Sequence, residues 1–339
     1  MSLLIETLFC KQVARRPVWL MRQAGRYLPE YQDFRKKHSL FSCFHEPDLA
    51  VEATLMPLKR FDLDAAIVFS DLLVIAEVWG KKVLYPEKDG PCIFPVLKSI
   101  EELYVPTKEE VKEKLSYVFS TITLLTPKLS LPLIGFCGAP FTLLCYLLEG
   151  KGGTSFPTVR TWIEHRNQEF LALLEMVAET CILFAKLQIE AGVEAFQIFD
   201  SWANLLSQEE FSLYVLPYWK KMQDALEPLR IPLLFFSRSN SAYPTLISSI
   251  KPRCISFDEG VSLATLRKIV PKEIAIQGNF SPHLLAFGSI SEIKKAAFAM
   301  VDSVREEAGI VFNLGHGVLP KTPIENVMAF LDSLRFYER

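Results

Sequence analysis

Short apolar segments recur along the chain, and a turn with polar residues or glycine follows each. Eight of them are largely hydrophobic, without regular alternation: residues 18–21, 65–69, 133–136, 195–199, 232–236, 254–257, 274–276 and 310–313. Such strands are typical of a parallel sheet covered on both faces. Helical patterns lie between them, as at residues 47–61, 170–191, 208–226, 263–270 and 291–308. This alternation predicts an α/β protein, a (β/α)8 TIM barrel formed by a single domain over residues 1–339.

Local signals support the boundaries of these elements. Ser207 and Glu210 have the spacing of a capping box, and Gly192 and Gly309 follow predicted helices where a left-handed residue ends a helix. The long interval between the second and third strands holds a short apolar run at residues 82–86 and a helix at residues 108–125. We therefore expect an excursion from the plain barrel there.

Composition fits one large globular unit without a general affinity for polyanions. Half of the 339 residues are hydrophobic and only 22% are charged, enough for an extensive core. The 37 basic and 39 acidic residues leave a net charge of −2. Because no broad positive field results, we expect no nucleic-acid partner and no binding to a membrane surface. Any anion must be bound by a local cluster.

The cysteines and the N-terminal segment indicate a cytoplasmic protein. Seven cysteines, an odd number without C-x-x-C spacing, are expected to stay reduced. The first six residues contain Glu6 and lack the basic start of a signal peptide. Residues 129–148 are uncharged and long enough to span a bilayer. Proline and glycine should break them into a strand, a turn and a helix start.

Polar residues follow several predicted strands where a barrel enzyme carries its catalytic groups. They are Arg22 after the first strand, Ser70 and Asp71 after the second, Asp200 and Ser201 after the fourth, His316 after the eighth, and Tyr146 on the helix after the third. One end of a barrel would gather all of them. Structural roles remain open for each: Asp71 or Ser201 could cap a helix, and Tyr146 could be a core residue.

The segment at residues 22–31 is the most specific signal for ligand binding. Arg22 and Arg26 each carry a planar fork that grips a carboxylate, and Gly25 allows backbone amides to approach a ligand. Two arginines four residues apart can also form a solvated helix face. With a strand before them, they favour a substrate that carries several carboxylates.

Motifs of other functional classes are missing from the sequence. It has no G-x-G-x-x-G, and residues 150–152 lack the upstream glycine and Ser/Thr of a phosphate-binding loop. The five histidines and scattered cysteines have no convincing zinc spacing. We therefore expect neither a nucleotide nor a metal. Residues 150–153, rich in glycine, could form a mobile lid or an ordinary loop.

Several separate motifs resemble the uroporphyrinogen decarboxylase family in the family's order. They lie at residues 17–26, 63–71, 135–142, 199–203 and 313–317. The resemblance implies a homodimeric (β/α)8 barrel that works without a cofactor. It also implies conversion of uroporphyrinogen III to coproporphyrinogen III, in which four acetate arms become methyl groups.

The resemblance further assigns roles to individual residues. Asp71 would accept the pyrrole N–H groups of the macrocycle and stabilise positive charge on it. Arg22, Arg26 and the backbone around Gln23, Ala24 and Gly25 would bind carboxylates, and Arg22 is also a candidate proton donor. The remaining contacts with the substrate would come from Tyr146, Ser201, His316 and Phe41.

The sequence departs from the usual family pattern at a few positions and leaves two rivals. Phe141 replaces a common Trp, Asn204 a common Gly, and residues 256–258 a common Asp-Trp pair. A methyltransferase of the same barrel superfamily would hold zinc with His and Cys, and the missing His-x-Cys arrangement opposes it. A porphyrinoid carrier that binds without turnover could use the same arginines and Asp71.

Overall fold

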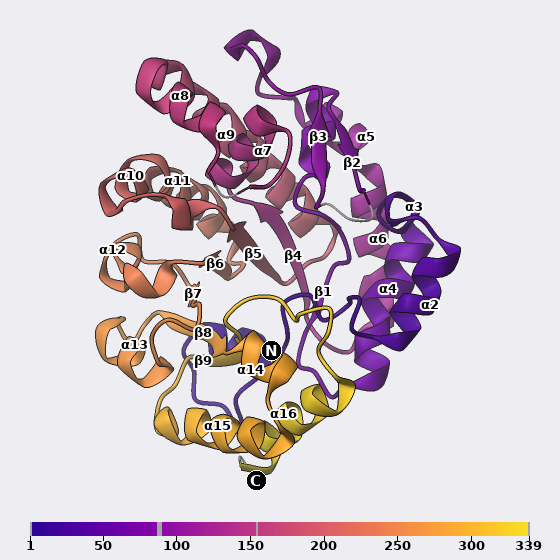
Figure 1. Ribbon diagram of the computed structural model, residues 1–339, viewed down its shortest axis with the longest axis vertical. Coiled ribbons are helices and arrows are strands. Elements are labelled where there is room, and N and C mark those ends of the chain that lie inside the picture. Colours follow the sequence, from indigo (N-terminus) through magenta and orange to yellow (C-terminus); the bar gives the residue numbers. More distant parts are fainter. Residues whose placement is uncertain (1, 87–89, 154, 338–339) are drawn as a thin grey trace.

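A computed structural model of the protein describes residues 2–86, 90–153 and 155–337, and its centre is a curled parallel sheet (Figure 1). Seven strands follow one another in the order of the chain and pair in parallel. They are β1 (Ala66–Ile67), β4 (Leu133–Gly138), β5 (Ala195–Asp200), β6 (Leu233–Ser237), β7 (Cys254–Ser256), β8 (Ala275–Phe280) and β9 (Ile310–Leu314). These strands confirm seven of the eight predicted runs.

The first predicted run, residues 18–21, fills the gap between the two edges of this sheet. Val18 forms a parallel bridge with Phe312 of β9, and the N–H of Trp19 donates to the Phe312 carbonyl at 3.3 Å. On the other side, the N–H of Asp64, just before β1, donates to the Val18 carbonyl at 2.8 Å. This first run thus closes the barrel, although it makes a bridge rather than a full strand.

The inside of the barrel confirms the closure, because each of the eight runs contributes a buried residue to one inner cluster. These residues are Trp19, Ala65, Ile134, Ala195, Leu234, Cys254, Ala275 and Val311. Helix α1 (Leu3–Leu8) packs Leu4, Ile5 and Leu8 into the same cluster. The N-terminal end of the barrel is therefore covered by α1.

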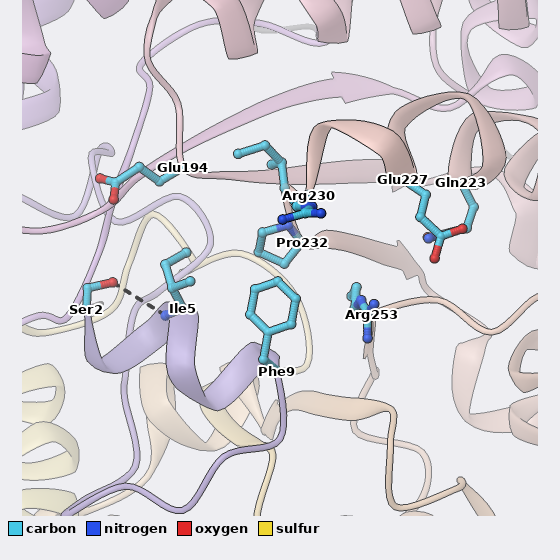
Figure 2. Close-up of a pocket in the computed structure, with 10 residues that line it drawn as sticks. Ser2, Ile5, Phe9, Glu194, Gln223, Glu227, Arg230, Pro232 and Arg253 are labelled. Carbon is cyan, nitrogen blue, oxygen red and sulfur yellow. Dashed lines mark hydrogen bonds between the residues drawn. The ribbon is translucent and has the colours of Figure 1, made fainter.

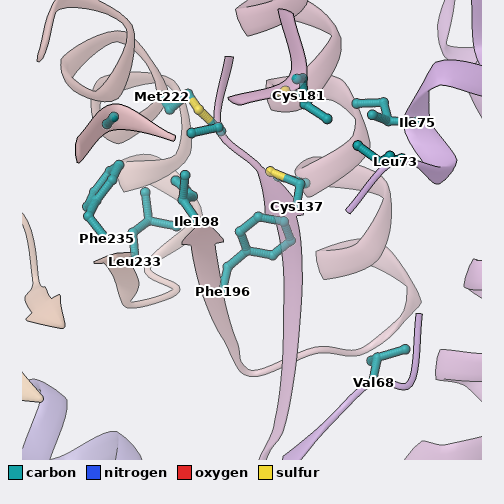
Figure 3. Packing of buried hydrophobic residues seen from close by; sticks show 14 of the residues in the cluster. Val68, Leu73, Ile75, Cys137, Cys181, Phe196, Ile198, Met222, Leu233 and Phe235 are labelled. Atoms are coloured by element: carbon teal, nitrogen blue, oxygen red, sulfur yellow. The ribbon is translucent and has the colours of Figure 1, made fainter. Parts of the chain in front are cut away.

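Helices wrap the outside of the sheet. Phe196, Ile198 and Cys137 point outward from the strands, and Met222 meets them from a surrounding helix (Figure 3). The helices that follow strands include α7 (Pro140–Glu149), α8 (Pro157–His165), α9 (Asn167–Ala191), α12 (Pro244–Ser248), α13 (Leu263–Ile269), α14 (Pro282–Phe287), α15 (Ile290–Ser303) and α16 (Ile324–Tyr337). Between the first run and β1 lie α2 (Pro29–Lys37), α3 (Leu40–His45) and α4 (Pro47–Arg60).

Two predicted helices are each divided. Residues 208–226 form α10 (Gln208–Tyr214) and α11 (Leu216–Leu226), because Pro217 has no N–H to continue a helix. Residues 108–125 form α5 (Lys108–Lys114) and α6 (Ser116–Leu125). The capping box of Ser207 and Glu210 is confirmed.

Of the two glycines that were predicted to follow helices, only Gly192 does so directly. Gly192 follows α9 directly with a φ of +122°. The predicted helix at residues 291–308 ends at Ser303, so Gly309 does not end it. Gly309 instead has a φ of +70° in the turn that leads into β9, a conformation that glycine adopts without strain.

The predicted excursion between the second and third barrel strands is present. Helix η1 (Val74–Trp79) leads to an antiparallel pair, β2 (Lys82–Leu84) and β3 (Cys92–Phe94). The N–H of Ile93 donates to the Gly150 carbonyl at 2.6 Å, and Cys92 bridges Lys151. The excursion is thus attached to the segment after α7.

The uncharged stretch at residues 129–148 divides as expected into β4, a turn and α7. Among the residues that the structure describes, no helix has the length and apolar character needed to cross a membrane.

Asp64 connects the closing run to the rest of the barrel. Its Oδ2 atom accepts the Val18 N–H at 2.8 Å, and its side chain is only 5% exposed. Arg15 grips both carboxylate oxygens at 2.9 and 2.6 Å, and Arg335 of α16 adds a bond at 2.8 Å. A buried carboxylate with this many donors is costly to disrupt, because its partners would be left without it.

We expect Asp64→Asn to lower the free energy of unfolding by about 3 kcal/mol, since two arginines lose their buried anion. Urea unfolding followed by circular dichroism measures this change. Asp62→Asn is the matched control, because the Asp62 side chain is 79% exposed while it contacts the same Arg335 at 3.2 Å. Equal stability of Asp64→Asn and the unmodified protein would contradict the role of Asp64 in closing the barrel.

Candidate active site

Arg22 and Asp71 are brought to the same end of the barrel because they follow neighbouring strands. Arg22 follows the closing run, and Asp71 comes four residues after β1. The carboxyl ends of all parallel strands lie at this end, which we call the C-terminal mouth. Their charges act on each other, since Arg22 lowers the pKa of Asp71 and Asp71 raises that of Arg22.

Asp71 is a half-buried carboxylate with one oxygen committed to its own turn. Its Oδ1 accepts the N–H of Leu73 at 2.8 Å. Loss of water around it raises the pKa of Asp71 to about 6, against the opposing effects of this bond and of Arg22. The capping bond leaves the second oxygen to accept a hydrogen bond from a ligand.

The backbone around Arg22 is unusual. Its φ of +61° is left-handed, which is uncommon for a residue other than glycine and marks a constrained site. Loss of water lowers the pKa of Arg22, and the charges of Arg238 and Arg26 lower it further. Three arginines therefore lie within electrostatic range at the C-terminal mouth.

The loop after β9 fits against Arg22. The N–H of Val318 donates to the Met21 carbonyl at 2.9 Å, and the Asn313 side chain accepts the Met21 N–H at 3.0 Å. Gly317 lies so close that a Cβ atom there would be 2.4 Å from Cδ of Arg22. Only glycine leaves room for the Arg22 side chain in this position.

Tyr146 belongs to the same group of residues. It lies on α7 with 9% exposure, and burial raises the pKa of Tyr146 to about 12. Asp71 raises this pKa and Arg22 lowers it, so the three groups interact. We call Arg22, Arg26, Asp71 and Tyr146 the arginine–aspartate site.

A second buried carboxylate, Asp200, supports α7 rather than facing the site. It accepts bonds from Oγ1 and N of Thr142 at 2.6 and 3.1 Å and from Nε1 of Trp219 at 3.1 Å. Burial raises the pKa of Asp200 to about 6. Asp200 thereby fixes the helix that carries Tyr146.

The segment after Arg22 contains one side chain held by the fold and two backbone N–H groups without a hydrogen bond among the described residues. The Gln23 side chain is buried, accepting the Leu20 N–H and donating to the Ala65 carbonyl, both at 3.2 Å. The Gln23 N–H also donates to the Leu20 carbonyl at 3.0 Å. Within the described part of the chain, no hydrogen bond is found for the N–H groups of Ala24 and Gly25, which remain candidates for a ligand.

The other predicted contacts border the arginine–aspartate site. Ser201 precedes Trp202, whose ring centroid is 6.0 Å from that of Tyr146, and the short helix η4 (Ala203–Leu205) starts from Trp202 without a side-chain cap. His316 precedes Gly317, and its Nδ1 lies 2.9 Å from the Gly317 carbonyl. Phe41 of α3 is 52% exposed. Direct contact of these three with a substrate stays a prediction.

A chain of contacts connects Phe41 with the segment that follows Asp71. The Phe41 ring stacks on His45 at 3.8 Å, and Nε2 of His45 lies 2.8 Å from the Glu77 carboxylate. Glu77 belongs to η1, and its charge raises the pKa of Asp71. Helix α3 is thus attached to the segment that follows Asp71.

Gly152 places the glycine-rich segment beside the site. A Cβ atom there would lie 3.0 Å from the Tyr146 hydroxyl and 2.8 Å from the Trp202 ring. Residues 150–153 therefore border the arginine–aspartate site. Whether they form a mobile lid or an ordinary loop stays open.

Three inward-facing aromatic residues were not singled out from the sequence. Phe136, Phe199 and Phe236 lie near the carboxyl ends of β4, β5 and β6. Phe236 belongs to the inner cluster, Phe199 packs against it, and Phe136 lies two residues beyond its member Ile134. The Phe199 ring is 5.7 Å from Phe136 and 5.9 Å from Phe236, edge to face in both pairs. They provide an apolar surface at the C-terminal mouth. The sequence does not separate them from core residues, because each lies in a run made up mainly of apolar residues.

A cavity of about 620 Å³ lies at the opposite end of the barrel (Figure 2). It is bordered by α1 and by residues that precede β5, β6 and β7, including Glu194, Arg230 and Arg253. None of the predicted site residues lines it. The site and this cavity are therefore separate features.

Together, the fold and the site define a (β/α)8 barrel with an acid, two arginines and a tyrosine at the C-terminal mouth, the place of catalysis in this class of enzyme. Comparison with known proteins gives the family. The model of the family "Uroporphyrinogen decarboxylase (URO-D)" matches residues 1–337. The chain belongs to the uroporphyrinogen decarboxylase family.

Individual relatives agree over nearly the whole chain. The uroporphyrinogen decarboxylase of Protochlamydia amoebophila is 39% identical over 332 residues, which cover 98% of this chain and 91% of the relative. That of Dictyostelium discoideum is 37% identical, covering 96% and 90%. A solved methyltransferase from Methanosarcina mazei has a TM-score of 0.85 over 100% of both chains but only 20% identity. That last likeness shows the fold alone.

We expect Gly317→Ala to reduce kcat/KM by at least tenfold while the protein still folds, because the added Cβ must displace the Arg22 side chain. Steady-state kinetics on uroporphyrinogen measure the loss, and circular dichroism checks the fold. Gly90→Ala is the matched control, since a Cβ atom at residue 90 meets no atom within 4 Å. Full activity of Gly317→Ala would show that the position of Arg22 tolerates change.

Proposed function

We propose that the protein converts uroporphyrinogen III to coproporphyrinogen III by removing carbon dioxide from four acetate arms without a cofactor. Membership of the uroporphyrinogen decarboxylase family makes it a carboxy-lyase of tetrapyrrole biosynthesis. The observation that carries the detailed proposal is the meeting of Asp71 and Arg22 at the C-terminal mouth. An acid among arginines suits a substrate that is anionic at its edge and carries N–H donors at its centre.

The side chains divide the recognition of this substrate. Arg22 and Arg26, with the N–H groups of the segment at residues 23–25, bind carboxylates of the arms. Asp71 accepts the pyrrole N–H groups at the centre of the macrocycle. The rings of Phe136 and Phe199 offer an apolar surface, and the remaining substrate contacts are those of Phe41, Ser201 and His316.

The substrate can serve as its own electron sink. A proton added to the ring carbon that bears the acetate arm turns the pyrrole into an iminium cation. The bond to the carboxylate then breaks, carbon dioxide leaves, and the electron pair forms an exocyclic methylene while it neutralises the iminium. A proton on the methylene gives the methyl group, and loss of the first ring proton restores the pyrrole. The net reaction consumes one proton for each carboxylate.

Asp71 accelerates this reaction because its charge matches the intermediate better than the substrate. A fixed anion near the iminium stabilises the transition state more than the neutral pyrrole. Tyr146, with a pKa of about 12, stays protonated at neutral pH and can donate a hydrogen bond to the reacting arm. Arg22 holds the carboxylate and is a candidate donor of the proton.

The setting of this reaction is proposed as well. The protein works as a homodimer, as the resemblance implies, and as a single-domain chain in the cytoplasm, as the strand pattern and the cysteines indicate. All seven cysteines are unpaired, which suits a reducing compartment.

Anaerobic incubation with uroporphyrinogen III, followed by oxidation and chromatography of the porphyrins, tests the function. We expect stepwise loss of carboxyl groups down to the tetracarboxylate. Asp71→Asn has nearly the same shape without the anion, and it should lose at least a hundredfold in kcat while circular dichroism stays unchanged. Binding without any turnover by the unmodified protein would support the carrier instead. Stoichiometric zinc in metal analysis would favour the methyltransferase.

The pH dependence of kcat should follow Asp71. Its pKa is raised to about 6 and the reaction needs its anion, so log kcat should fall with unit slope below about pH 6. The folded state holds its protons on Asp71 and Asp200 more tightly than the unfolded chain does. These two groups therefore make the fold more stable, not less, as pH falls through 6. Circular dichroism at each pH checks that the protein stays folded. An undiminished kcat at pH 5 would exclude the Asp71 anion from the reaction.

A further inference from the structure

Arg238 is a third arginine at the C-terminal mouth that the sequence motifs did not single out. It directly follows β6, whose carboxyl end lies between those of β5 and β7. Its guanidinium carbon lies 5.3 Å from the centroid of the Trp202 ring, and this ring is 6.0 Å from Tyr146. Arg238 therefore borders the arginine–aspartate site on the side of β5 and β6.

The charge of Arg238 reaches the site. Among charged neighbours it has the largest effect on Arg22, lowering its pKa, and it also lowers the pKa of Tyr146. Two exposed guanidinium groups thus repel each other across the same mouth. The arrangement is unfavourable in the free protein and becomes favourable when an anion lies between them.

No acidic side chain of the described part of the chain pairs with Arg238, whereas two other arginines on neighbouring helices are paired. Arg160 contacts Glu210 and Arg166 contacts Glu169. The acid on the next loop, Asp258, already accepts bonds from N and Oγ of Ser241 and from the Gly260 N–H. The Trp202 ring holds the Arg238 fork in place without neutralising it.

We propose that Arg238 binds a carboxylate of the substrate, one of the propionate groups that the reaction leaves in place. Asp71 and Tyr146 are the more enclosed groups, and with Arg22 they surround the reacting arm. Arg238 is exposed at the rim, where an arm directed away from the reacting centre ends. The inference rests on the proposed function and adds a residue that selects for a substrate with carboxylates around its whole edge.

Arg238→Gln should raise KM for uroporphyrinogen III about fivefold and leave kcat within about twofold, because an exposed, charge-assisted contact is made equally in substrate and transition state. Arg238→Lys should recover part of the loss, since the charge stays while the paired donors are lost. The pentacarboxylate intermediate, which keeps all four propionates, should show the same fivefold effect.

Arg230→Gln is the matched control. Arg230 is also exposed, but it precedes β6 and lines the cavity at the opposite end of the barrel (Figure 2). Its removal changes the net charge equally and should not alter KM. The inference is overturned if Arg238→Gln keeps the KM of the unmodified protein, if it lowers kcat alone, or if Arg230→Gln raises KM as much. Failure of the unmodified protein to release carbon dioxide would instead refute the proposed function.

Discussion

The buried carboxylate of Asp64 is the interaction on which the rest of the structure depends. Seven strands alone form a curled sheet with two open edges, and the short run at residues 18–21 must join them. Asp64 binds the Val18 N–H while Arg15 and Arg335 neutralise it. Arg22 directly follows this run and Asp71 follows β1, so the contact that closes the barrel also brings the acid and the arginine of the site together.

The two ends of the barrel have different tasks. Helix α1 fills the N-terminal end with Leu4, Ile5 and Leu8, which makes that end part of the core. At the C-terminal mouth the inner surface ends in aromatic rings, of which Phe136 and Phe199 are partly exposed, and positive groups surround it without full compensation. The protein thus keeps like charges close together at this end, where the proposed polyanionic substrate would relieve the repulsion. Apolar packing characterises one end of the barrel, and uncompensated positive charge characterises the other.

Local backbone features at the mouth position the side chains of the site. Arg22 has a left-handed backbone, and Gly317 and Gly152 leave space for Arg22 and Tyr146 respectively. Each glycine occupies a position where one added carbon atom would meet a functional group. The partial removal of water that raises the pKa of Asp71 also strengthens its interaction with positive charge. Close packing at the mouth therefore both positions these side chains and strengthens the interactions between their charges.

The sequence by itself determined the alternation of strands and helices and the places where Arg22, Asp71 and Tyr146 follow strands, because apolar runs and strand ends are local patterns. It did not determine the break at Val215 or the early end of α15 at Ser303, where single residues and packing decide. Only the tertiary structure separated Phe199, which faces inward, from Phe196, which faces the helices, since both are phenylalanines of one strand. It also decided that Asp64 closes the barrel and that Arg238 lies beside Tyr146. Those contacts join residues far apart in the chain, and the closing of the circle of strands, not any local pattern, brings them together.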